Sequence, residues 1–588
     1  MTAPNRNTLW AGVLVDELAK SGIDGVCVSP GSRSTPLTVA FAEHPNIEVF
    51  SHLDERSSAF FALGRSRRTG TPTPLVCTSG TAGANMHPTV MEASESRVPL
   101  LVLTADRPPE LQDSGANQTT DQEKLYGDAV RYYATLPEPD PEPRKLRSLR
   151  VRTNRAVNRA TGNPPGPVHL NVPFRKPLEP ISVEGDVPAD LAERHPEVVE
   201  GRAGPYVTAA NGRPTLDAPA LDRVTAAVSE ADRGVIVCGP ANRPTPDRDA
   251  LAALAEATGL PVLADPLSGV RFGPHTSEIP VFGGYDSYLD GAEETWPSPD
   301  VVLRFGASPT SKVLRKYLAA VDARQFVVDP AGAWPEAEFT ATDLLAADPS
   351  SVAAGIAERE PDAGDPAYRE RFAAMERAYW NLVGDACSEE WFEGAVLAAV
   401  TAGLPDPATC YVSNSMPVRD LDRFARPRTA DITALGNRGV SGIDGIVSSA
   451  LGAGSATGEP LALVIGDLAY YHDMNGLLAV QRCDVDATIV LVDNDGGGIF
   501  HKLPIEQFDP PFTDQFRTPH GLDFEPTGEL YGFEFDRVEG SEAFEDVFAE
   551  SIHSDGTQVL SVEFDSEESH RFRESLHERV REAHDQSE

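Results

Sequence analysis

Two polar residues that follow apolar runs are the clearest candidates for chemistry. The run LALVIG leads to Asp467, and ATIVLVD leads to Asn494, 27 residues further along the chain. Both runs predict parallel strands, and neighbouring parallel strands bring their carboxyl ends to one edge of a sheet, where ligands bind. With a backbone carbonyl near Gly496, these side chains form the hard-oxygen set that Mg²⁺ takes beside a diphosphate. A solvated loop acid is the alternative for Asp467 alone, but its pairing with Asn494 favours the ligand interpretation. The segment after Asp467 predicts a helix whose N-terminus could receive the diphosphate.

The elements that must position such residues occur in three groups of apolar runs separated by helix-length segments. In the first group they are GVCVSPGS (25–32), IEVFSHLD (47–54), TPLVCTSGT (73–81), PLLVLTADRP (99–108) and GPVHLNVP (166–173). In the second they are RGVIVCGP (233–240), LPVLADP (260–266), DVVLRFGASP (300–309) and ARQFVVDP (323–330). In the third they are TCYVSNS (409–415), ITALGN (432–437), LALVIGD (461–467), ATIVLVDND (487–495) and TQVLSVEFD (557–565). Runs of this kind are typical of buried strands in parallel α/β sheets.

Two polar, proline-containing stretches separate the groups. Pro177–Pro219 is rich in proline and acids and predicts a linker, and Asp348–Pro366 leads to helices around Ala367–Val383. A chain of 588 residues is also too long for one hydrophobic core. We therefore predict an α/β protein of three successive domains with parallel sheets, at residues 1–180, 205–347 and 385–588.

The charge composition limits the partners and the environment. A net charge of −40 argues against nucleic-acid and anionic-membrane partners, because the field of the protein repels phosphates. Only seven residues are lysine, and such an acid-rich, lysine-poor composition resembles that of proteins from extreme halophiles, where molar salt screens self-repulsion.

No apolar run approaches the length of a bilayer span, and the N-terminus does not resemble a signal peptide, so we expect a cytoplasmic protein. The six cysteines form no CxxC pair, which favours buried thiols over a zinc site or disulfides.

The spacing of Asp467 and Asn494 resembles the metal and diphosphate motif of thiamine-diphosphate-dependent enzymes, whose three domains match the predicted organisation. Further motifs resemble, within that class, the MenD family of 2-succinyl-5-enolpyruvyl-6-hydroxy-3-cyclohexene-1-carboxylate synthases, over nearly the full chain. They are SPGSRSTPL (29–37), TSGTAGAN (78–85), TADRPPELQDSGANQT (104–119), GNRGVSGIDG (436–445), GDL (466–468) and DNDGGGIF (493–500). One departure is visible, because the family often has a run of asparagines where Asp493 and Asp495 flank Asn494 here.

The resemblance implies thiamine diphosphate and Mg²⁺ or Mn²⁺ as cofactors, and 2-oxoglutarate and isochorismate as substrates. It also implies a homodimer or homotetramer, because relatives place the cofactor between two subunits. The implied metal ligands are Asp467, Asn494 and the Gly496 carbonyl. The implied cofactor contacts are Glu55, Ser415, Ile443, Gly466, Asp467, Leu468 and Asn494. The implied catalytic residues are Glu55, Ser32, Arg33 and Gln118. The implied substrate contacts are Ser32, Arg33, Arg107, Asn117, Gln118, Lys312, Ser415, Arg419, Arg438, Ile499, Phe500 and Leu503.

These implied roles agree with the chemistry of the side chains. Glu55 would contact the aminopyrimidine ring, and the apolar run after it predicts that it opens a buried helix. Ile443 would support the bent cofactor. Both implied substrates are dicarboxylates, so the site must gather cations, and Arg suits planar, bidentate carboxylate binding. The cations available are Arg33, Arg107, Arg419, Arg438 and Lys312. Ile499, Phe500 and Leu503 would help to keep water from the reacting carbon.

Three alternatives remain open at this point. A related thiamine enzyme, such as a simple 2-oxo acid decarboxylase or an acetolactate-synthase-like enzyme, would share most of the motifs, and product analysis with and without isochorismate would distinguish it. A non-catalytic homologue that keeps the fold is disfavoured by the intact Glu55, Asp467 and Asn494. A generic nucleotide-binding protein is disfavoured because TSGTAGAN lacks the lysine of a phosphate-binding loop.

Overall fold

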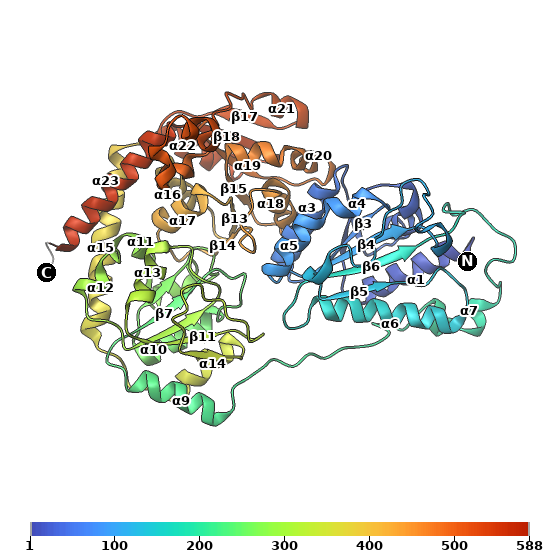
Figure 1. Cartoon of the computed structure of the whole chain (residues 1–588), viewed down its shortest axis with the longest axis horizontal. Helices are drawn as coiled ribbons and strands as arrows, with labels where there is room; N and C mark the ends of the chain where they lie inside the picture. The colour runs from blue at the N-terminus through green and yellow to red at the C-terminus, as the bar shows by residue number, and fades with distance from the viewer. Residues whose placement is uncertain (1–2, 586–588) are drawn as a thin grey trace. The chain divides into compact units, whose positions relative to one another are not determined.

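The computed structural model describes residues 3–585 and contains three six-stranded sheets in which every strand pair is parallel (Figure 1). The first sheet consists of β1 (Gly25–Val28), β2 (Glu48–Ser51), β3 (Thr73–Cys77), β4 (Leu100–Asp106), β5 (Tyr132–Thr135) and β6 (Pro167–Pro173). The second consists of β7 (Gly234–Cys238), β8 (Val262–Ala264), β9 (Val281–Phe282), β10 (Val301–Phe305), β11 (Arg324–Val328) and β12 (Asp343–Leu345). The third consists of β13 (Ala408–Val412), β14 (Ile432–Leu435), β15 (Leu461–Gly466), β16 (Thr488–Asp493), β17 (Glu534–Arg537) and β18 (Gln558–Glu563). The prediction of three parallel α/β domains is confirmed.

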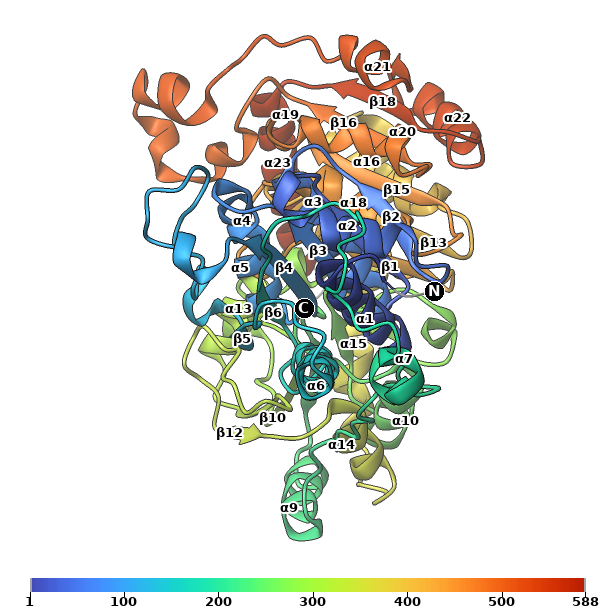
Figure 2. The same ribbon diagram turned by 90° about the vertical axis from the view of Figure 1, so that its right-hand side faces the viewer.

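Helices cover both faces of the first sheet. On one face lie α1 (Arg6–Lys20) and α6 (Pro143–Ala160), which Figure 1 and Figure 2 show side by side. Trp10 and Leu14 of α1 and Leu149 of α6 are fully buried against strand residues such as Val26 and Leu101. On the other face lie α3 (Glu55–Thr69) and α5 (His87–Glu95). Because both faces are covered, the strands read as continuous apolar runs rather than as alternating patterns.

The first and third sheets share one topology. Their strand orders are β2-β1-β3-β4-β6-β5 and β14-β13-β15-β16-β18-β17, so each strand has a counterpart at the same place in the other sheet. The second sheet has the different order β12-β11-β10-β7-β8-β9. In the first and third sheets the first, third and fourth strands along the chain are therefore neighbours, and the residues that follow them meet at one edge.

Helices on the second and third sheets bury two further cores. The second sheet packs on one face against α9 (Ala218–Ser229), α10 (Arg248–Thr258) and α14 (Pro349–Ala357). Its other face packs against α11 (Tyr285–Tyr288), α13 (Lys312–Ala320) and α15 (Pro366–Glu389). The third sheet packs against α16 (Glu393–Gly403), α17 (Met416–Phe424) and α22 (Ser541–Ser551). No helix in residues 3–585 is both long enough and apolar enough to cross a membrane.

Sequence patterns missed four strands, and all four lie at sheet edges. These strands are β5, β9, β12 and β17. Strand β17 is largely exposed, β5 is half-buried throughout, and β9 has only two residues. An edge strand is paired on one side only and need not be uniformly apolar, so it carries little of the signal that reveals a central strand.

The two stretches that separate the groups are more ordered than linkers. Within Pro177–Pro219, Leu191 and Val198 are buried in the core of the first sheet, and fully buried Arg150 donates to the Val198 carbonyl at 2.9 Å. Asp348–Pro366 contains α14, whose N-terminus is capped by the side chain of Asp348. Both stretches still connect the sheets, but parts of them are ordered, because a few apolar residues suffice to dock a polar stretch on a core.

The chain forms two compact units. The first comprises the chain through Asn211 together with Gly439–Gly458 and His472–Val485, and the second comprises the remainder. Within the first unit, α3 packs closely on α18 (Ile446–Gly454), where a Cβ at Gly64 would lie 1.8 Å from the Ser449 carbonyl oxygen. Only glycine permits this approach, so part of the third sequence segment is fixed to the first domain.

Candidate functional site

The second unit places Asp467 and Asn494 side by side. Strands β15 and β16 are parallel neighbours with Gly466 opposite Val492, and each polar residue follows its strand. Oδ2 of Asp467 accepts the backbone N–H of Asn494 at 3.3 Å and that of Gly496 at 2.8 Å. Asp467 is 2% exposed and Asn494 is 8% exposed. Leu468 follows Asp467 in α19 (Asp467–His472), a helix of six residues.

The side chains at this edge suit a divalent cation. Oδ1 of Asn494 is buried and, within residues 3–585, has no hydrogen-bond partner. Ligand atoms of Asp467, Asp493 and His520 lie within 4.8 Å of one another. Burial and the neighbouring Asp467 carboxylate raise the pKa of Asp493 to about 6. Two facing carboxylates and an unpaired amide oxygen are a hard-oxygen arrangement whose repulsion a bound Mg²⁺ or Mn²⁺ would remove.

Gly496 and the two flanking acids have distinct positions. A Cβ at Gly496, where φ is +136°, would lie 2.1 Å from the Arg517 carbonyl oxygen, so only glycine fits. The Gly496 carbonyl accepts the N–H of Gly498 at 3.1 Å and keeps a second lone pair. Asp495 accepts the backbone N–H groups of His520 and Gly521 at 2.8 and 2.7 Å. The His520 ring also contacts both acids, with Nε2 3.1 Å from Oδ2 of Asp467 and Nδ1 3.6 Å from Oδ1 of Asp495. Asp493 is therefore a carboxyl group beside the expected metal ligands, whereas Asp495 fixes the loop at His520 and Gly521.

Two arginines gather at the end of the neighbouring strand β13. Ser415, in a left-handed conformation with φ of 72°, precedes α17, and its carbonyl accepts Nη1 of Arg419 at 2.5 Å. Nη1 of Arg438 donates to Oδ1 of Asn414 at 2.8 Å. Burial and the charge of Arg438 lower the pKa of Arg419. Two close guanidinium groups repel each other, and a dicarboxylate would offset that repulsion.

The remaining expected substrate contacts of the second unit occupy other elements. Lys312 is exposed at the first position of α13, and the preceding Ser311 donates to Asp286 at 2.5 Å. Ile499 and Phe500 are half-buried in a short 3₁₀ helix, Gly498–Lys502, and the Phe500 ring meets that of Phe516 at 5.5 Å. Leu503 is 47% exposed at the end of this helix. Within residues 3–585, no hydrogen bond or ion pair joins Lys312, Phe500 and Arg419 to one another.

The first unit gathers a second set of cations at the ends of β1, β3 and β4. Ser32 and Arg33 lie in a 3₁₀ turn, Ser32–Ser34, after β1, and Nη1 of Arg33 donates to the Phe174 carbonyl at 2.8 Å. Nη1 of Arg107 donates to Oγ of Ser79 at 2.7 Å and to the Gln118 carbonyl at 2.6 Å. Burial and the charge of Arg107 lower the pKa of Arg33. Gln118 has a φ of 55°, and the exposed Asn117 precedes it in the same loop.

Glu55 and Ile443 also belong to the first unit. Glu55 is the first residue of α3, as expected, and Asp54 caps that helix through the N–H groups of Arg56 and Ser57. Glu55 is half-buried. Burial of the Cys77 thiol at the end of β3, together with the charge of Glu55, raises the pKa of Cys77. Ile443 is half-buried and precedes α18.

Three polar residues near the expected site were missed from the sequence. Glu92 is buried and accepts the N–H groups of Gly439 and Val440 at 2.8 and 2.7 Å, which holds the segment that carries Ile443. Glu393 is buried and accepts Nδ2 of Asn494 at 2.8 Å. An acid in the apolar helical run FEGAVLAAV is a signal that could have revealed Glu393, since a buried carboxylate needs partners. His520 lies in irregular chain and gave no such signal.

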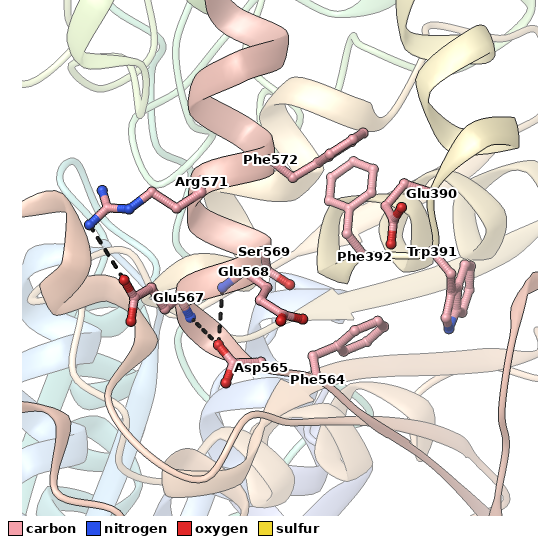
Figure 3. A pocket seen from close by; sticks show the side chains of 10 residues that line it. All are labelled: Glu390, Trp391, Phe392, Phe564, Asp565, Glu567, Glu568, Ser569, Arg571 and Phe572. Carbon is pink, nitrogen blue, oxygen red and sulfur yellow. Dashed lines mark hydrogen bonds and ion pairs between the residues drawn. The ribbon is translucent and has the colours of Figure 1, made fainter.

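Two hollows are lined by other residues. One in the second unit, of about 720 Å³, is lined by Trp391, Phe392, Phe564, Phe572 and several acids (Figure 3). One in the first unit, of about 570 Å³, is lined by Asp106, Asp113, Asp121, Glu123 and neutral neighbours. The acids of the second hollow would repel a dicarboxylate. Neither hollow contains the arginines expected to bind substrate.

Comparison with known proteins gives concordant matches along the chain. Residues 10–125 match the N-terminal TPP binding domain of thiamine pyrophosphate enzymes, residues 204–412 the middle domain, and residues 420–562 the C-terminal TPP binding domain. The chain is 62% identical over 589 residues to the 2-succinyl-5-enolpyruvyl-6-hydroxy-3-cyclohexene-1-carboxylate synthase of Haloarcula marismortui, covering 99% of both chains. It is 60% identical to the protein of the same name from Halobacterium salinarum, again with 99% of both chains covered, and 46% identical to that of a Roseiflexus species, with 96% covered.

Proposed function

This chain belongs to the thiamine-diphosphate-dependent 2-succinyl-5-enolpyruvyl-6-hydroxy-3-cyclohexene-1-carboxylate synthases, and we propose that it carries out their reaction in menaquinone biosynthesis. In this transferase reaction, 2-oxoglutarate loses CO₂, and the remaining four-carbon unit adds in a 1,4 sense to isochorismate with uptake of one proton. One carbon–carbon bond breaks and one forms. Bound thiamine diphosphate would supply the electron sink that makes the decarboxylation possible.

The observation that carries this proposal is the pairing of Asp467 with Asn494. They follow neighbouring parallel strands, both are buried, and the Asn494 amide oxygen has no partner within the described chain. We propose that Asp467, Asn494 and the Gly496 carbonyl hold Mg²⁺ or Mn²⁺ against the cofactor diphosphate. Gly466, Leu468 and Ser415 would complete the cofactor contacts.

The two arginine pairs are proposed to bind the substrate carboxylates. In each pair, burial and a second guanidinium lower the pKa of one member, as for Arg33 beside Arg107 and Arg419 beside Arg438. A site that concentrates cations offsets the repulsion that a protein with a charge of −40 exerts on dianions. Ser32, Asn117, Gln118 and Lys312 would add hydrogen bonds to substrate.

The remaining proposed roles concern proton transfer and water. Glu55, fixed at the first turn of α3, would hydrogen-bond the aminopyrimidine ring and exchange a proton with it. Ser32, Arg33 and Gln118 would orient the reacting groups in near-attack geometry. Ile443 would support the cofactor, and Ile499, Phe500 and Leu503 would keep water from the reacting carbon.

Product analysis tests the proposal. Purified protein in high salt is incubated with 2-oxoglutarate, isochorismate, thiamine diphosphate and Mg²⁺, and the products are identified by mass. The expected product contains both substrates less one CO₂. Release of succinic semialdehyde alone, at the same rate with and without isochorismate, would instead identify a simple 2-oxo acid decarboxylase.

We further propose that the protein is a cytoplasmic homodimer or homotetramer, because its family places the cofactor between two subunits. Size-exclusion chromatography with light scattering in molar KCl measures the subunit number. A monomer that binds thiamine diphosphate with full activity would contradict this part of the proposal.

A further inference from the structure

Asn494 differs from the other proposed metal ligands because its side chain has two unlike ends. The amide oxygen can bind a cation, whereas the amide nitrogen is a donor and cannot. The carboxylate of Asp467 has no such ambiguity. Metal binding therefore depends on something that fixes which end of the Asn494 amide faces the metal.

Glu393 meets this requirement. Its Oε1 accepts Nδ2 of Asn494 at 2.8 Å, and Glu393 is 2% exposed. An ionised carboxylate only accepts hydrogen bonds, so the nitrogen end of the amide must face Glu393 and the oxygen end must face away. That oxygen is the buried Oδ1 that has no partner in residues 3–585.

Glu393 is itself held in place by a buried guanidinium group. Its Oε2 pairs with Nη2 of Arg573 in α23 (Ser566–Asp585). Arg573 is also bidentate to Asp420, with Nε to Oδ1 at 2.8 Å and Nη2 to Oδ2 at 2.6 Å. All three charged side chains are buried, so the pairing supplies the counter-charge that a buried carboxylate needs.

The helices that carry this network are packed beside it. Phe392 and Phe572, which precede Glu393 and Arg573, have ring centroids 4.7 Å apart, and Figure 3 shows the two rings next to each other. A Cβ at Gly498 would lie 2.8 Å from Nδ2 of Asn494, so the chain is close around the amide as well. The packing of α16 against α23 therefore fixes the side chain of Glu393, which in turn orients the amide of Asn494.

We propose that Glu393 is a positioning residue that presents the Asn494 oxygen to the cofactor's divalent metal, and that Arg573 holds Glu393 ready to do so. This inference rests on the proposed metal site. It assigns a role in metal binding to Glu393 and Arg573, which lie far from the metal motif in sequence.

The isosteric variant Glu393→Gln tests the proposal. Arg573 attracts the oxygen of the new glutamine amide, which turns the nitrogen towards Asn494 and forces the Asn494 amide to present its own nitrogen to the metal. Loss of such an orienting partner typically weakens metal binding by about 10- to 100-fold. Apoenzyme with thiamine diphosphate in molar KCl is titrated with Mn²⁺, and free Mn²⁺ is measured by electron paramagnetic resonance. Wild-type Mn²⁺ affinity in this variant would overturn the proposal.

A second substitution separates orientation from packing. In Glu393→Gln with Asn494→Asp, the new carboxylate has no donor end, accepts the glutamine N–H, and offers oxygen to the metal either way round. We expect the double variant to recover Mn²⁺ binding relative to Glu393→Gln alone. If Glu393 served only to hold α16 on α23, Asn494→Asp would restore nothing, and that result also overturns the proposal.

Two controls complete the experiment. Asp420→Asn removes the same charge from the same cluster without touching Asn494, so it should lower the melting temperature and leave Mn²⁺ affinity unchanged. An equal loss of affinity in Asp420→Asn would contradict a specific role for Glu393.

Asp467→Ala should abolish Mn²⁺ binding. If Asp467→Ala still binds Mn²⁺, the proposed metal site is misplaced, and the proposed positioning role of Glu393 fails with it. If Asp467→Ala loses Mn²⁺ affinity but Glu393→Gln does not, only the positioning role is refuted.

Discussion

The backbone N–H of Gly496 donates to Oδ2 of Asp467 across 2.8 Å, which ties the turn after β16 to the end of β15. This hydrogen bond therefore joins the two segments that carry the proposed metal ligands. Removing the Asp467 carboxylate should therefore disturb the geometry of the turn as well as remove a proposed metal ligand.

We expect Asp467→Ala to weaken the binding of thiamine diphosphate itself in the presence of Mg²⁺, measured by calorimetry or tryptophan fluorescence. Asp495→Asn is the control, because Asp495 is not a proposed metal ligand and accepts two loop N–H groups that the asparagine oxygen can also accept. Retained cofactor affinity in Asp467→Ala would remove this residue from the site.

Glu55→Gln should separate activation from anchoring. The variant keeps the size of the side chain but cannot exchange a proton with the pyrimidine ring, so turnover should fall by about 10²- to 10⁴-fold while cofactor binding persists. Glu48→Gln, at an exposed position of β2, serves as the control. Wild-type turnover in Glu55→Gln with the cofactor bound would show that Glu55 is misassigned.

Arg419→Ala and Arg438→Ala should impair the use of a dicarboxylate substrate and leave cofactor binding nearly intact. Losing one partner of a buried charge pair costs on the order of 2–5 kcal/mol, which would appear in kcat/KM. Arg426→Ala replaces an exposed arginine close by in the chain and should have no effect. Unchanged kinetics for both substrates would exclude the pair from substrate binding.

Folding and activity should require high salt. A net charge of −40 destabilises the compact state unless ions screen it, so the melting temperature should rise steeply from dilute buffer to molar KCl. A melting temperature and an activity that do not change with salt would refute the halophilic interpretation.

Asp473 should make stability depend on pH. Burial raises its pKa to about 7, well above that of an unfolded chain, so the folded state holds its proton more tightly. Stability from this group is present at low pH and is lost as pH rises through about 7. Its Oδ2 accepts the Ser448 N–H at 2.7 Å, which Asn can also accept, so Asp473→Asn should flatten the decline between pH 5 and 8 in urea titrations. The same slope in both proteins would disprove this assignment.

The sequence alone determined the parallel α/β class, the central strands and the pairing of Asp467 with Asn494. Each of these follows from local patterns. A strand that is covered on both faces must be apolar, and a polar side chain at the carboxyl end of the strand comes directly after that apolar run in the sequence. The resemblance to the family's motifs likewise identified the arginines and Glu55 as candidate site residues.

Only the tertiary structure decided which groups fix those residues. Glu393 lies 101 residues before Asn494 and 180 residues before Arg573, yet all three belong to one buried network. Strands β5, β9, β12 and β17 and the docking of α3 on α18 were likewise not visible in the sequence, and neither were the different contacts of Asp493 and Asp495. Contacts of this kind depend on how helices and loops pack, and packing brings together residues whose spacing along the chain carries no periodic signal.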